Sequence, residues 1–110
     1  MNGVVKHINR KLRLVAVLTD NRDYTILELF RDGGLILGRT DFVLGDEVSW
    51  SADMPLGEDL LTNFTRGGFC RVVFQVHNVT NEQLERGRLF NGRSQETYPE
   101  YSTGEEPGRG

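Results

Sequence analysis

Short apolar segments, each ended by turn-forming residues, fill most of the first eighty positions of this 110-residue chain. Several of them alternate apolar and polar residues, as half-buried strands do. The chain also has ten valines and only two alanines, which favours strands over helices. We predict five strands, over residues 4–8, 12–18, 24–30, 47–50 and 69–79. The pattern therefore indicates an all-β domain.

Alternation within these segments assigns residues to a core face. In the second strand the predicted core face consists of Leu12, Leu14, Ala16 and Leu18. In the last strand the predicted core face consists of Val72, Phe74 and Val76. Trp50 is also expected to fill the core, because it shares a strand face with Val48.

Five short strands fit a small barrel, because closure removes the exposed edges of a flat sheet. Our first choice is a five-stranded OB-type barrel over residues 1–90, and an SH3-like barrel is second. Residues 60–64 could form one helical turn or an irregular strand. A short helix is predicted over residues 81–90, because Thr80 and Gln83 have the spacing of a capping box. Residues 91–110 contain no Leu, Ile, Val or Phe, and we predict a disordered tail there.

The composition narrows the function classes. No segment approaches the roughly 18 consecutive apolar residues that a membrane span needs, and the N-terminus lacks the pattern of a signal peptide. The single cysteine, Cys70, fits a reducing compartment. We therefore expect a cytoplasmic protein that has no membrane partner.

A cluster of positive charge lies at the start of the chain, although the net charge is −3. Lys6, Arg10, Lys11 and Arg13 fall within the first thirteen residues, and no acidic residue lies among them. Any affinity for nucleic acid must come from such a local patch, because the whole molecule is acidic. The alternative is an ordinary solvated hairpin whose charges serve solubility.

The run Gly3-Val4-Val5-Lys6-His7-Ile8-Asn9, followed by Lys11, resembles the opening of the cold-shock domain. In that OB-fold family the first hairpin reads G-x-V-K-W-F-N and then K-G-F-G-F-I. The phrase Leu44-Gly45-Asp46-Glu47-Val48 similarly resembles the approach to the fourth strand in cold-shock and S1-type domains. The resemblance covers about residues 3–80, and it is most specific at Gly3, Val5, Lys6, Asn9 and Lys11.

The resemblance implies binding of single-stranded RNA or DNA on exposed aromatic residues, most of which this chain has replaced. His7 stands where the family has Trp, and Arg13 and Val15 stand where it has two phenylalanines. In the third strand the matching position is Tyr24 or Thr25. Imidazole and guanidinium planes can also stack on unpaired bases. We predict weak, sequence-tolerant binding, in which bases stack on His7, Arg13 and Tyr24 and phosphates contact Lys6, Arg10 and Lys11.

A second hypothesis is a protein-interaction module that presents Val5, Val15 and Val17 as an apolar patch. The sequence shows neither a nucleophile with its base nor a set of zinc ligands. Cys70 and His77 are seven residues apart on one predicted strand, about 23 Å along it, so they cannot form a nucleophile and base pair. Two histidines and one cysteine at scattered positions make a poor zinc site. We expect no catalysis, no cofactor, no metal and no small-molecule substrate.

Overall fold

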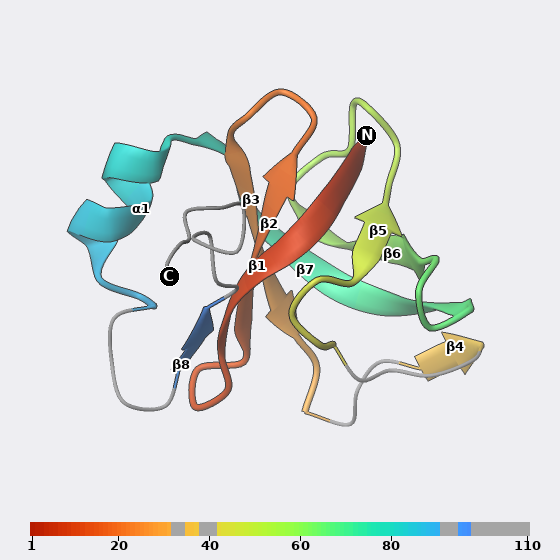
Figure 1. The fold of residues 1–110 in the computed structure, drawn as a ribbon. Coiled ribbons are helices and arrows are strands. Elements are labelled where there is room, and N and C mark those ends of the chain that lie inside the picture. Colours follow the sequence, from red (N-terminus) through yellow and green to blue (C-terminus); the bar gives the residue numbers. More distant parts are fainter. Residues whose placement is uncertain (32–34, 38–41, 91–94, 98–110) are drawn as a thin grey trace, which may run out of the picture.

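A computed structural model of the chain describes residues 1–31, 35–37, 42–90 and 95–97. Six strands form the wall of a small barrel (Figure 1). They are β1 (Asn2–Asn9), β2 (Leu14–Thr19), β3 (Tyr24–Leu29), β5 (Glu47–Ser49), β6 (Gly57–Asn63) and β7 (Gly68–Val79). The remaining described elements are β4 (Leu35–Leu37), α1 (Asn81–Gly87) and β8 (Gln95–Thr97).

Two three-stranded meanders build the barrel, β1-β2-β3 and β5-β6-β7. They join where β1 pairs with β5 and where β3 pairs with β7, and all six pairings are antiparallel. The predicted all-β barrel with one short helix is confirmed, and its closed antiparallel form is consistent with an OB-type fold. It has six wall strands rather than five, because residues 57–63 form β6. An even number of strands lets every neighbouring pair run antiparallel, which an odd number cannot do.

The barrel interior holds the main core. Trp50 and Phe74 lie in it, as predicted, with their rings 5.6 Å apart. The assignment of faces in β2 was wrong, because Val15 and Val17 point into the barrel and are fully buried. Val5 is buried beside them, so the predicted apolar patch does not exist on the surface.

Two apolar residues that were predicted to be in the core lie at the surface instead. Leu12 is 46% exposed because it belongs to the turn before β2. Val76 is 40% exposed. The pairing of β3 with β7 shifts register near Val76, so the alternation of β7 does not continue past Phe74. Such shifts re-aim the side chains that follow them.

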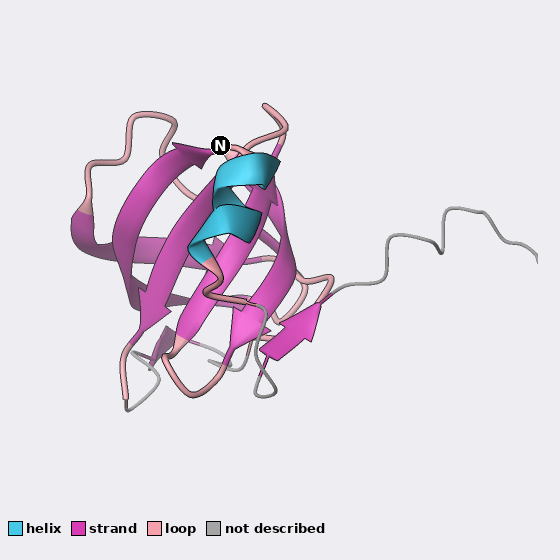
Figure 2. Ribbon diagram, turned by 90° about the vertical axis from the view of Figure 1, so that its left-hand side faces the viewer, coloured by secondary structure: helices cyan, strands magenta, loops and turns pink. Residues whose placement is uncertain are grey.

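A second, smaller apolar cluster lies outside the barrel, between the wall and α1. Figure 2 shows α1 lying across the outer surface of the strands. Leu84 of α1 and Phe90 pack against Ala16, Tyr24 and Ile26 of β2 and β3. Both faces of β2 are therefore covered, one by the barrel interior and the other by this cluster.

The predicted helix is confirmed, although it ends at Gly87 rather than at residue 90. Thr80 and Gln83 form the predicted capping box, with both hydrogen bonds at 3.0 Å. Arg88 follows in the left-handed conformation, with φ of 57°, and its N–H donates to the Glu85 carbonyl. This turn directs the chain back toward the wall, where Phe90 is buried.

The predicted tail begins at residue 91, and part of it is structured. Gln95–Thr97 form β8, which pairs with residues 7–9 of β1. For these three residues the prediction of disorder was wrong, because their backbone is bound to β1. The prediction for residues 91–94 and 98–110 lies outside the described residues. In the described part of the chain, no helix has the length and apolar character that crossing a membrane would require.

Candidate nucleic-acid interface

The basic cluster of the sequence surrounds the turn between β1 and β2. Arg10 donates from Nε to Glu96 at 2.6 Å and from Nη2 to the Phe42 carbonyl at 3.1 Å. Arg13 has a φ of 57° and donates from Nε to the Leu29 carbonyl at 3.2 Å. Lys11 is exposed at the tip. The turn is therefore a fixed structure that carries its positive charge at one end of the barrel.

Both arginines of this turn have acidic neighbours. Glu96 pairs with Arg10, and Glu28 lies 3.9 Å from the Arg13 guanidinium. These pairs are about one-third to one-half exposed, so each contributes little to stability and exchanges readily with other anions. A phosphate that binds here competes with a carboxylate already present.

A β-bulge in β1 directs the next aromatic candidate, His7, outward. Val5 pairs with Val17, but His7 pairs with Ala16, so Lys6 is an extra residue in the ladder. Because of this insertion, Val5 and Ile8 both point into the barrel, while His7 faces the outer wall. Bulges are a common means of re-aiming a side chain near a binding site.

His7 and Tyr24 meet on the outer wall. The His7 ring lies 5.7 Å from the ring of Tyr24 and 5.7 Å from that of Phe90. Its Nδ1 is hydrogen-bonded to the Thr97 hydroxyl at 3.1 Å. Tyr24 is only 6% exposed, so its ring supports His7 and does not form an open stacking platform.

A groove of about 500 Å³ opens beside these rings, between α1, β8 and the outer wall. It brings together one imidazole, one phenol, one guanidinium and polar groups of α1 and β8. The residues that line it are His7, Leu18, Arg22, Tyr24, Asn81, Glu85 and Thr97. Its size and its mixed polar and aromatic lining suit a planar, hydrogen-bonding group.

Sequence reasoning missed part of this surface. Arg22 lies in the turn after β2 with a φ of 70°, and nothing in its spacing indicated that it would line the groove. Phe90 and Thr97 reach His7 from more than eighty residues away in the chain. The capping box at Thr80 was the one sequence signal for this side of the groove, because it indicated that a helix follows the last barrel strand.

Two residues that carry the cold-shock resemblance have structural roles in the barrel. A Cβ atom on Gly3 would lie 2.5 Å from the Val17 Cγ1 and 2.8 Å from the Leu18 carbonyl oxygen, so only glycine fits there. Asp46 is 1% exposed and accepts hydrogen bonds from the Val43 N–H and the Asn63 amide, each at 3.1 Å. These positions therefore follow from the fold and carry no information about a ligand.

Cys70 and His77 both have packing contacts in the barrel. Cys70 is buried in the barrel, and burial raises the pKa of its thiol above the ordinary value. Among the described residues, no group of three or more His, Cys, Asp or Glu side chains could hold a metal ion. His77 stacks on Trp50 and is hydrogen-bonded to Thr25, which gives it a packing role.

Comparison of the chain with protein-family models, with curated protein sequences and with solved structures finds no match.

Proposed function

We propose that this protein is a cold-shock-like module of the OB type that binds single-stranded RNA or DNA weakly and with little sequence preference. The observation that supports the proposal is that His7 faces outward from β1, and that the basic Arg10–Arg13 turn directly follows the same strand at one end of the barrel. The matches to the family at Lys6 and Lys11 agree with this proposal, because both residues are cations of the predicted surface.

The contacts divide between phosphates and bases. Lys6, Arg10 and Lys11 are the groups for the phosphates, and the Arg13 guanidinium offers a plane on which a base can stack. A base would enter the groove beside His7, where Arg22 offers a second planar group. One stacking imidazole contributes less than the roughly 1–3 kcal/mol of a good aromatic platform. The proposed affinity is accordingly low.

Titration of fluorescein-labelled oligothymidylate and oligouridylate at low and moderate salt tests this function. We expect binding that weakens as salt rises, since at most four cations meet phosphates and the logarithmic slope is at most about 3. Amide shifts in 15N NMR spectra should concentrate on residues 6–13 and on the rim of the groove. Absence of binding at low salt and high protein concentration would refute the proposal.

Charge-matched variants locate the surface. Lys11→Ala together with Arg13→Ala should reduce affinity at least tenfold at low salt without unfolding the barrel, because both side chains are at least partly exposed in a turn. Arg71→Ala together with Arg86→Ala is the charge-matched control, because both are exposed cations outside the lining of the groove and each pairs with one glutamate. Equal losses in the two proteins would mean that the hairpin is not the binding surface.

A further inference from the structure

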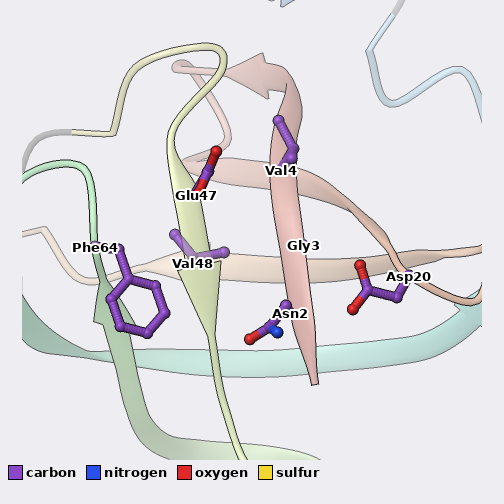
Figure 3. Close-up of a pocket in the computed structure, with 7 residues that line it drawn as sticks. All are labelled: Asn2, Gly3, Val4, Asp20, Glu47, Val48 and Phe64. Carbon is purple, nitrogen blue, oxygen red and sulfur yellow. The ribbon is translucent and has the colours of Figure 1, made fainter.

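A second groove, of about 390 Å³, lies on the outer wall where β1 meets β5 (Figure 3). Its floor is formed by the paired backbone of β1 and β5 at Gly3 and Val48, and the Val48 side chain packs into the barrel core. The Phe64 ring stands at one end and Asp20 at the other, with Asn2 between them. None of its residues belongs to the proposed nucleic-acid surface, so the two sites can be tested separately.

Phe64 is 62% exposed, the highest value among the large apolar residues that the structure describes. Its backbone is nevertheless fixed. The Phe64 N–H donates to the Glu47 carbonyl at 2.8 Å, and the Glu47 N–H donates to the Thr65 hydroxyl at 2.8 Å. A large exposed ring that lines a groove, on a backbone held in place, is typical of a binding surface.

The charge of the groove is negative. Glu47 and Asp20 are both exposed on its rim. Neither carboxylate takes part in an ion pair with the described residues. Phosphate groups would be repelled here, which excludes nucleic acid as the occupant. A cation is attracted both by the carboxylates and by the face of the Phe64 ring.

We propose that this groove binds an arginine side chain from a basic segment of a partner protein. The guanidinium is planar, so it can lie on the Phe64 ring and donate to Glu47 at the same time. The Asn2 side-chain oxygen and Asp20 lie further along the groove, where they can accept hydrogen bonds from the backbone of the segment or from a second cation. A lysine ammonium is a compact, strongly hydrated charge and fits this flat arrangement less well.

A blocked peptide that contains one arginine, compared with the same peptide containing citrulline, tests the proposal. Citrulline keeps the shape of arginine and lacks its charge. In 15N NMR titrations of the full chain, the arginine peptide should shift the amides of Gly3, Val4, Glu47 and Phe64. The citrulline peptide should bind at least fivefold more weakly. Equal shifts from both peptides, or shifts outside the groove only, would overturn the proposal.

Variants of the protein separate the two parts of the site. Phe64→Leu keeps an apolar side chain but removes the ring face, and it should weaken the arginine peptide about two- to fivefold. Glu47→Gln should weaken it by a similar factor and reduce its salt dependence. Leu60→Ala and Glu58→Gln are the controls, since both are exposed residues of β6 outside the groove. Equal losses in variants and controls would show that no specific site exists.

Discussion

At the scale of single residues, Asp46 shows how a small barrel fixes its loops. Its carboxylate is buried and lies 3.2 Å from the Arg66 guanidinium, and it also binds the Val43 N–H and the Asn63 amide. One side chain therefore joins the approach to β5 to the turn that follows β6. The sequence phrase around Asp46 matched a family signature, and in this structure the carboxylate explains that match without any ligand.

Removal of this carboxylate should destabilise the protein strongly. Asp46→Ala removes the partner of the Arg66 guanidinium and also the acceptor of the Asn63 amide. The free energy of unfolding should therefore fall by about 3 kcal/mol. Urea denaturation followed by Trp50 fluorescence measures the loss. Asp53→Ala is the matched control, because Asp53 is exposed, and it should change stability by less than about 0.5 kcal/mol. Similar midpoints for the two variants would contradict this role.

At the scale of elements, α1 is held by its cap and by one apolar contact. The helix has seven residues, which is too short to persist alone in water. Its first turn depends on the Thr80 hydroxyl, which accepts the Gln83 N–H, and its buried residue is Leu84. The cap and the docking of Leu84 on the wall therefore act together to hold α1 in place as one side of the groove beside His7.

Loss of the cap should loosen α1 selectively. Thr80→Ala should cost about 1 kcal/mol and raise hydrogen exchange of the helix amides about fivefold, while Thr80→Ser should behave like the wild type because it keeps the hydroxyl. Hydrogen exchange read by NMR distinguishes the helix from the barrel. Equal exchange in the alanine and serine variants would mean that the capping box does not stabilise the helix.

The elements also show how far the sequence could predict the structure. The strands that flank clear turns were predicted to within about two residues, because alternation and turn chemistry are local. The faces of β2 were reversed, since Ala16 and Val15 are both fully buried and alternation cannot rank two apolar faces. The contacts of His7 with Phe90 and Thr97 were not predicted, because both residues reach it through tertiary contacts alone.

At the scale of the whole molecule, barrel closure makes the two meanders depend on each other. The β1–β5 and β3–β7 pairings close the wall, and side chains from both meanders share one core. Cys70 of β7 lies in that core next to β6, where its neighbour across the ladder is Leu61. A negative charge on this thiol would be kept from water for as long as the barrel stays closed. The ionisation of Cys70 therefore depends on whether the whole domain is folded.

This burial predicts how stability depends on alkaline pH. The folded barrel disfavours the thiolate and raises the pKa of Cys70, so the unfolded chain loses this proton first. The contribution is complete below the unfolded pKa of about 8.5, and above it the free energy of unfolding falls by up to about 1.4 kcal/mol per pH unit until the folded thiol ionises. Cys70→Ala removes this slope. Urea titrations of both proteins between pH 8 and 10 measure how the free energy of unfolding changes with pH. The same pH dependence in the two proteins would mean that the barrel opens locally around Cys70 and does not act as a single cooperative unit.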